Sequence, residues 1–189
     1  MELNDYQIKD FHTQNGDALD INLVYATHGK LNENRDNAIL VVTSYSATHE
    51  DAEDLFVKSD ALDLSDYCVI VINMLSNSAS SSPSNTPAPF DGPRFPLITV
   101  NDNVRAQHHL ITQELAITRL RLVMGFSMGG LQTFEWGAQH SDMVDAILPI
   151  CGAARVSNHN WLFLEGAKSA LLADPEFKDG DYTSRPEVG

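Results

Sequence analysis

The stretch Gly125-Phe126-Ser127-Met128-Gly129-Gly130 follows the apolar run Leu120–Met124 directly, and this join decides the expected fold. The run is typical of a buried strand, and the spacing of the apolar residues over 131–138 is typical of a helix. A Gly-x-Ser-x-Gly pattern in that context predicts a sharp turn that exposes the Ser127 hydroxyl at the edge of a sheet. Such a serine has a strained backbone, and glycine on either side avoids collisions with neighbouring main chain. The alternative is a glycine-rich turn that only packs a helix close to a sheet.

Strands and helices alternate outward from this turn. Buried strands are indicated by three further apolar runs that are too short for helices, at 38–43, 67–72 and 146–151. Helices are indicated by the apolar spacing at 50–63, from a cap at Asp102 or Asn103 to about 119, and at 158–173. Residues 5–11 and 18–25 alternate in polarity around Asn15-Gly16, which predicts an antiparallel hairpin. We therefore expect an α/β fold with a mainly parallel sheet, helices on both faces and this hairpin at the N-terminus.

Residues 76–96 form a long connection that contains five of the eight prolines. Neither a helix nor a sheet can run through such a segment. A flexible linker is one interpretation. We favour an ordered functional loop, because Phe90, Phe95 and the rigid prolines are unlike a solvated Gly/Ser spacer.

The charge balance of the chain excludes several classes of partner. Its 26 acidic and 12 basic residues give a net charge of −14, which repels phosphate backbones and anionic lipid. We therefore expect neither nucleic acid nor a membrane as partner. The first residues lack the pattern of a leader and no run has the length of a membrane span, so a cytoplasmic protein is expected. Cys68 and Cys151 lie in apolar runs and are expected to be buried thiols, and no metal-binding spacing is present.

The segment Thr43–His49 follows the first buried strand and is placed to complete the site at Ser127. Catalysis by a serine requires backbone donors for the oxyanion, one of them from the loop after an earlier strand. We select the N–H groups of Tyr45 and Met128, and Ser44 or Ser46 remain alternatives to Tyr45. An ordinary Ser/Thr-rich turn is the other interpretation of this segment.

Four groups of residues together resemble a known family. They are Tyr25-x-Thr27-x-Gly29-x-Leu31-Asn32, Arg35-Asp36-Asn37-Ala38, Gly125-Phe126-Ser127-Met128-Gly129-Gly130, and Asp174-Pro175 with Gly180 and Tyr182. The chain resembles the homoserine O-acetyltransferase branch of the α/β-hydrolase superfamily from about residue 6 to its last residues. The resemblance implies that Ser127 is the nucleophile, that the amides of Tyr45 and Met128 form the oxyanion hole, and that no cofactor or metal is bound. It also implies that acetyl-CoA is a co-substrate, that a small hydroxy amino acid accepts the acyl group, and a place in methionine biosynthesis; a homodimer remains open.

The chain departs from that branch at the position of a substrate-binding arginine, six residues before the Asp-Pro pair, where it has Lys168. Lysine keeps the charge but lacks the planar two-pronged donor that grips a carboxylate. The segments 43–51 and 82–96 are more similar to a divergent group of α/β-fold hydrolases. A serine esterase is therefore an alternative to the acyltransferase.

The residues after Ser127 do not complete a catalytic triad. In this fold the acid and the histidine follow the nucleophile in the chain, but only His140 and His159 do so here. His140 would lie roughly 20 Å away at the far end of the helix, and His159 comes too early to be the terminal histidine. We expect both to be surface or capping residues. Residues 1–189 are accordingly interpreted as the incomplete N-terminal part of a single α/β-hydrolase domain that lacks its last strands and is inactive alone. A catalytically inactive, truncated paralogue that acts as a binding or assembly module is the remaining alternative.

Two other polar groupings have simpler explanations than a site. His108 and His109 diverge by about 100° around a helix and cannot share one metal ion. Asp51, Glu53 and Asp54 are expected to be solvated acids at the start of a helix, where negative charge is favourable.

Overall fold

A computed structural model describes residues 2–58, 62–184 and 186–187. The chain divides into two compact units, residues 1–82 with 96–154 and residues 83–95 with 155–189. Within the described residues, no helix is long and apolar enough to cross a membrane.

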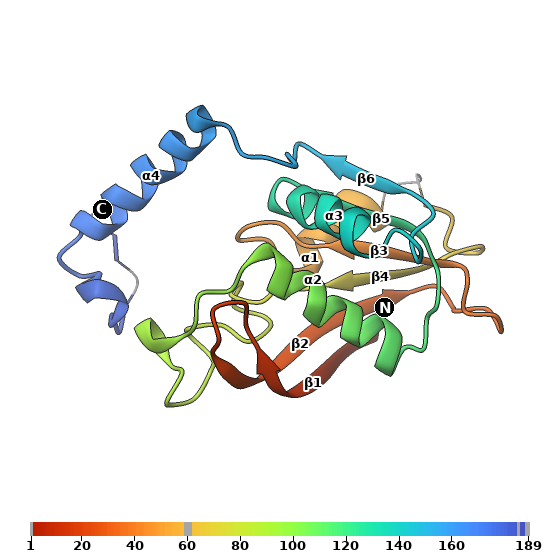
Figure 1. The fold of residues 1–189 in the computed structure, drawn as a ribbon, viewed down its shortest axis with the longest axis horizontal. Helices are drawn as coiled ribbons and strands as arrows, with labels where there is room; N and C mark the ends of the chain where they lie inside the picture. The colour runs from red at the N-terminus through yellow and green to blue at the C-terminus, as the bar shows by residue number, and fades with distance from the viewer. Residues whose placement is uncertain (1, 59–61, 185, 188–189) are drawn as a thin grey trace. The chain divides into compact units, whose positions relative to one another are not determined.

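The first unit is built on one mixed sheet (Figure 1). In the described residues its strands have the order β1-β2-β4-β3-β5-β6, with the bounds β1 (Glu2–His12), β2 (Ala18–His28), β3 (Ala38–Val42), β4 (Cys68–Ile72), β5 (Leu120–Phe126) and β6 (Ile147–Ile150). The strands β4, β3, β5 and β6 are parallel to one another, whereas β1 pairs with β2 and β2 with β4 in antiparallel fashion. The expected parallel sheet and N-terminal hairpin are therefore confirmed.

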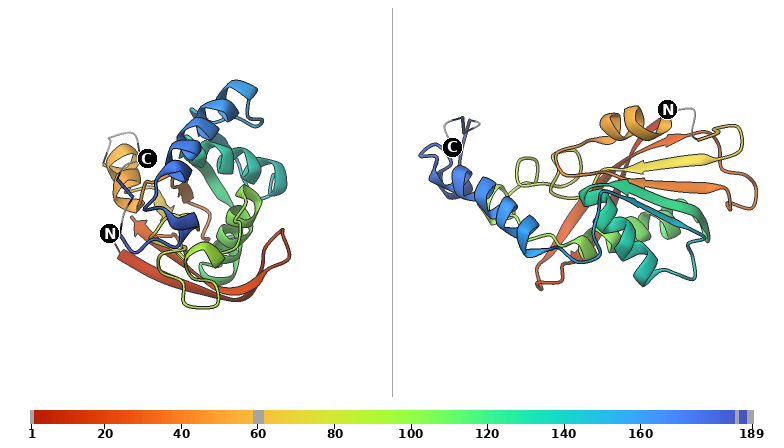
Figure 2. Two further views of the ribbon diagram at one scale, coloured as in Figure 1. Left: turned by 90° about the vertical axis from the view of Figure 1, so that its left-hand side faces the viewer. Right: turned by 90° about the horizontal axis from the view of Figure 1, so that it is seen from above.

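The central strands are continuous apolar runs because both of their faces are covered. All residues of β3 and β4 are buried. On one face the side chains of Ile39, Val41 and Val71 pack against Phe56 and Val57. Figure 2 shows, in its right-hand view, α1 (His49–Ala52) on one side of the sheet and α2 (Val100–His109) and α3 (Met128–Gln139) on the other. The helices thus lie on both faces, as expected.

Two helices differ from their predicted bounds. The segment expected to be helical over 50–63 forms α1 and then a π-helical turn over Glu53–Val57. Its residues 59–61 lie outside the described residues. Helix α2 begins earlier than predicted, and it continues as a π-helical turn over Leu110–Glu114. Its cap is Thr99, whose hydroxyl accepts from the Asp102 N–H at 3.1 Å, while the Asp102 carboxylate accepts from the Thr99 N–H at 2.9 Å. Asp102 therefore belongs to the first turn, as the acidic partner of a capping box.

The strand β6 contains Pro149 and pairs with β5 on one side. Because β6 pairs only with β5 within the described residues, the missing N–H of Pro149 leaves no bond of this ladder unmade. Cys151 follows β6 and is exposed, contrary to expectation, because the chain leaves the covered part of the sheet there. Cys68 is buried as expected, and burial raises the pKa of its thiol.

The long connection is hydrogen-bonded to β2 in its first part. The Ser81 N–H donates to the Asn22 carbonyl at 2.9 Å, and the Ser80 hydroxyl accepts from the Val24 N–H at 2.9 Å. Serine side chains here continue the pairing that β2 would otherwise lack. From residue 83 to 95 the connection belongs to the second unit, where Gly92–Arg94 form a short 3₁₀ turn.

The second unit contains the helix α4 (Asn158–Ala173) and a 3₁₀ turn at Lys178–Gly180. Ser157 caps α4 by accepting from the Asn160 N–H at 3.2 Å. Trp161 is 60% exposed on α4, whereas Trp136 in the first unit is fully buried.

Candidate active site

Ser127 stands at the join of β5 and α3 with the strained backbone expected of it. Its φ of 54° and ψ of −114° lie where residues other than glycine are uncommon. The turn is held by a hydrogen bond from the Ser127 N–H to the Ile150 carbonyl at 2.8 Å, and the Ser127 carbonyl accepts from the Leu131 N–H at 3.3 Å. The residue is partly exposed. The surrounding main chain therefore holds the serine in an unfavourable conformation at the sheet edge.

The two glycines of the turn are required by close approach of the main chain. A Cβ on Gly125 would stand 2.6 Å from the Gly129 carbonyl oxygen, and a Cβ on Gly129 would stand 2.6 Å from the Val42 carbonyl oxygen. No real side chain tolerates such distances. The helix α3 can start directly on the ends of β3 and β5 only because both positions lack a side chain.

The topology brings the loop after β3 to the same edge as Ser127. Strands β3 and β5 are parallel neighbours, and Val42 is aligned with Gly125. Segment 43–49 and Ser127 therefore leave adjacent strand ends. Met128 is the first residue of α3, so its N–H lies at the positive end of the helix dipole. Within the described residues, neither the Tyr45 N–H nor the Met128 N–H donates to a protein acceptor.

Two asparagines after β4 hold the loop that contains Tyr45. The Asn73 carboxamide oxygen accepts from the His49 N–H at 2.8 Å. The Asn77 carboxamide donates to the Ser44 carbonyl at 3.3 Å and also to the Ala47 carbonyl. The main chain on both sides of Tyr45 is therefore tied to the scaffold, although its side chain is 76% exposed.

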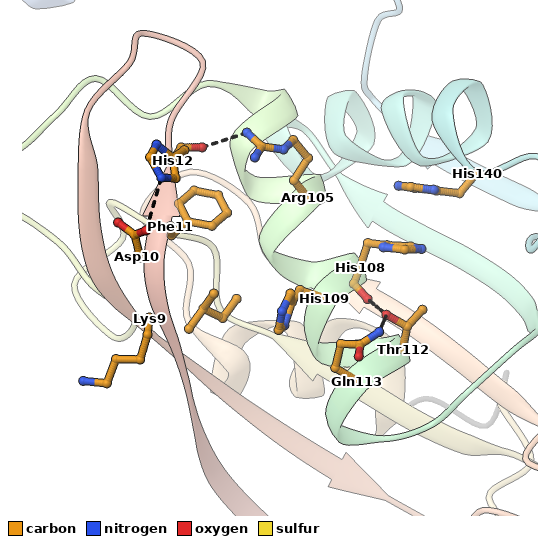
Figure 3. A pocket seen from close by; sticks show the side chains of 11 residues that line it. Lys9, Asp10, Phe11, His12, Arg105, His108, His109, Thr112, Gln113 and His140 are labelled. Carbon is orange, nitrogen blue, oxygen red and sulfur yellow. Dashed lines mark hydrogen bonds and ion pairs between the residues drawn. The ribbon is translucent and has the colours of Figure 1, made fainter.

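The first histidine that follows Ser127 in the chain, His140, lies at the far end of α3. His140 ends α3 and stacks on His108, with ring centroids 4.0 Å apart. Both line a cavity of about 420 Å³ between β1 and α2, which also contains Phe11 and Arg105 (Figure 3). Burial lowers the pKa of both imidazoles. His159 is exposed on α4 in the second unit. In the described part of the chain, no histidine forms a hydrogen bond with Ser127.

The neighbouring residues His108 and His109 point to different partners. The His109 Nδ1 lies 2.9 Å from the Tyr6 hydroxyl, whereas the His108 ring stacks on His140. The two rings therefore share no ligand position, as expected from their spacing.

A histidine–carboxylate pair that the sequence analysis missed joins His28 and Glu53. The His28 Nε2 lies 3.0 Å from a Glu53 carboxylate oxygen; the Glu53 side chain is buried at 7% exposure and the His28 side chain is largely buried at 11%. Glu53 is thus not the solvated acid that was expected, because the turn after α1 faces the sheet. The pair lies near the start of β4, since His28 is aligned with Val69, so it occupies the opposite sheet edge from Ser127. No local pattern joins two residues 25 positions apart.

Lys168 lies on α4 in the second unit. Its ammonium nitrogen is 3.4 Å from a Glu165 carboxylate oxygen, and its side chain is 61% exposed. A role for Lys168 in substrate binding stays a prediction.

Comparisons with known proteins find similarity to esterases and to homoserine acyltransferases. The sequence model of the alpha/beta hydrolase fold matches residues 38–186. The chain is 44% identical to ethyl acetate hydrolase from Pseudomonas veronii over 167 residues, which cover 88% of this chain and 48% of that protein. It is 35% identical to homoserine O-acetyltransferase from Zymomonas mobilis over 179 residues, which cover 86% of this chain and 48% of that protein.

Among solved structures, the acetyl esterase MekB matches with a TM-score of 0.94 and 40% identity, covering 97% of this chain and 54% of that chain. The chain therefore spans about half the length of the curated relatives it matches.

Proposed function

The chain belongs to the alpha/beta hydrolase fold family, and from this premise we propose that it carries the nucleophile of a serine esterase for short-chain esters, acetyl esters above all. The observation that carries the proposal is the strained turn at Ser127, beside the unpaired N–H groups of Tyr45 and Met128. The strain is explained if the hydroxyl has to be presented to a substrate.

The proposed reaction proceeds in two steps on Ser127. Its Oγ attacks the ester carbonyl carbon, and the N–H groups of Tyr45 and Met128 donate to the oxyanion of the tetrahedral intermediate. Collapse expels the alcohol, which takes the proton that a histidine removed from Ser127, and leaves the acyl group on the serine. Water then attacks the acyl-serine and releases the carboxylic acid. We assign the histidine and its carboxylate partner to the rest of the whole protein.

Two observations favour hydrolysis over transfer to homoserine. The esterases among the relatives reach 44% identity, compared with 34–37% for the homoserine O-acetyltransferases among them. By the family resemblance, Lys168 takes the place of a substrate-binding arginine of the transferase branch, and a lysine does not reproduce the two-pronged contact to an amino-acid carboxylate. Transfer from acetyl-CoA to homoserine is the second candidate, supported by the identity that extends over 86% of the chain.

The test uses the whole protein that contains these 189 residues. We expect it to hydrolyse p-nitrophenyl acetate and ethyl acetate and to be labelled by a fluorophosphonate on Ser127. Ser127→Ala should remove the label and lower kcat by up to about 10⁶-fold. Ser65→Ala, in an exposed turn, is the control and should leave both unchanged. A protein that is never labelled would instead be the inactive paralogue.

The acyl acceptor is identified in a separate assay with acetyl-CoA. Release of free CoA that depends on added homoserine would establish the transferase. Ester cleavage that needs no acceptor, with no homoserine-dependent CoA release, would establish the esterase.

A further inference from the structure

A chain of hydrogen bonds crosses the interior of the first unit and ends at the loop after β3. The Trp136 Nε1–H donates to the Gln107 Oε1 at 2.8 Å, and the Gln107 Nε2–H donates to the Gln132 Oε1 at 2.6 Å. The Gln132 Nε2–H donates to the Thr43 carbonyl oxygen at 3.0 Å. Trp136, Gln107 and Gln132 are fully buried. Burial of two neutral amides in an apolar core requires that their polar groups are paired, and this chain pairs them.

The direction of the chain is set at Trp136. An indole nitrogen can only donate, so Gln107 must present its oxygen to Trp136 and its nitrogen to Gln132. Gln132 must then present its oxygen to Gln107, and its nitrogen is left for Thr43. One orientation of both amides satisfies every bond, and in that orientation the chain ends with a donor directed at the main chain.

Thr43 is held on two sides. Its N–H donates to the Ile72 carbonyl at 3.3 Å, and its hydroxyl accepts from the Met74 N–H at 3.0 Å. These bonds tie Thr43 to the end of β4, whereas Gln132 ties its carbonyl to α3. The peptide that starts the loop to Tyr45 is therefore placed by both neighbours.

Gln132 also lies one turn after Met128 on α3, and its Nε2 is 3.4 Å from the Met128 carbonyl oxygen. One side chain thus links the first turn of the helix to the start of the loop. We infer that Gln132 is a positioning residue that sets the spacing between the Tyr45 and Met128 amides, and that Gln107 and Trp136 orient it. This inference rests on the proposed function, because it concerns the same oxyanion site.

Gln132→Met in the whole protein removes the donor and keeps a buried side chain of similar length. A donor misplaced by about 1 Å costs about 10²-fold in rate, so we expect kcat for p-nitrophenyl acetate to fall by about 10- to 100-fold. KM should change little, because the ground-state ester does not need these amides. The affinity for a trifluoromethyl ketone, which forms a tetrahedral adduct with the serine, should fall by the same factor as kcat/KM.

Gln139→Met is the matched control, since Gln139 is exposed at the end of the same helix. It should leave kcat, KM and ketone affinity unchanged. Thermal unfolding is measured for every variant. If Gln132 only stabilises the fold, Gln132→Met lowers the melting temperature but leaves ketone affinity unchanged below it, and the inference is overturned.

Gln107→Met tests the same chain one step further from the loop and serves if Gln132→Met does not fold. We expect a smaller loss of ketone affinity, and no additional loss when Gln107→Met is combined with Gln132→Met. The inference is contradicted if the folded variants keep their ketone affinity while Ser127 is still labelled by the fluorophosphonate. That outcome would not contradict the proposed function. Failure of the unsubstituted protein to label overturns both.

Discussion

The Cα of Gly129 faces the Val42 carbonyl so closely that a Cβ on Gly129 would stand 2.6 Å from the Val42 oxygen. The same Cβ would meet the Thr43 carbonyl oxygen at 3.2 Å. The first turn of α3 therefore packs directly against the main chain at Val42 and Thr43, where the loop to Tyr45 starts. Any group inserted there must push apart the two segments that carry the proposed oxyanion donors.

Gly129→Ala should destabilise the protein and reduce its activity. Overpacking of this kind costs about 1–3 kcal/mol, because neither the helix nor the strand end can move independently. Gly166→Ala is the matched control, since Gly166 is in the interior of α4 and its Cβ would meet nothing within 4 Å. Gly166→Ala should raise the free energy of unfolding by about 0.5–1 kcal/mol, because alanine is the better helix former. Denaturant unfolding of both variants tests the contrast, and equal effects would contradict it.

Ser127→Gly should give a protein that is inactive yet more stable than Ser127→Ala. Both changes remove the hydroxyl, but only glycine relieves the strain at φ 54° and ψ −114°. The strain is of order 1–3 kcal/mol, and the greater chain entropy of unfolded glycine offsets part of the gain from relieving it. We therefore expect the free energy of unfolding of Ser127→Gly to exceed that of Ser127→Ala by about 1 kcal/mol. Melting temperatures report it. Ser65 has no positive φ and serves as the control. There, Ser65→Gly should be less stable than Ser65→Ala, because no strain is relieved.

Glu53→Ala should cost about 2 kcal/mol, because it leaves the buried imidazole of His28 without its partner. Asp54→Ala is the neighbouring control. Asp54 pairs with Lys58 on the surface, where such pairs contribute little, so the free energy of unfolding should hardly change. Denaturant unfolding measures the free energy of unfolding of both variants, which differ in whether the removed carboxylate is buried. A larger loss of stability in Asp54→Ala than in Glu53→Ala would contradict the prediction.

The stability of the protein should fall as the pH drops below about 6.5. Burial, followed by repulsion from His140 and His109, lowers the pKa of His108 from its ordinary value of 6.5, and burial lowers that of His140; Asp142 acts in the opposite direction on both. Above pH 6.5 these groups are neutral in the folded and the unfolded chain. Below it the unfolded chain takes up protons first, so folding loses stability until the folded pKa is passed.

His140→Gln should therefore flatten the decline in melting temperature between pH 7 and pH 5. His159→Gln, at an exposed position of α4, should leave the profile of the unsubstituted protein as it is. An unchanged slope in His140→Gln would show that the stacked pair does not contribute.

Local patterns were sufficient for most of the fold. Continuous apolar runs predicted β3 and β4, because strands covered on both faces need no polar side chain. The same signal found β5 and β6, but β6 was expected to be buried and its residues are exposed or half-exposed in the described residues. The start of α2 was wrong although its signal is local: Thr99 and Asp102 have the spacing of a capping box. The pairing of His28 with Glu53 had no such signal, because the two residues meet only when α1 is laid on the sheet.

The sequence by itself determined the turn at Ser127. Glycines at 125 and 129 and the change from strand to helix periodicity are properties of adjacent residues, and they already imply an exposed hydroxyl. Only the tertiary structure decided what stands beside it. The placement of β3 next to β5 brings the loop of Tyr45 to Ser127, and the burial of Gln107 and Gln132 against Trp136 directs a donor at Thr43. Those contacts join residues up to 89 positions apart, so they depend on strand order and burial, which no local spacing encodes.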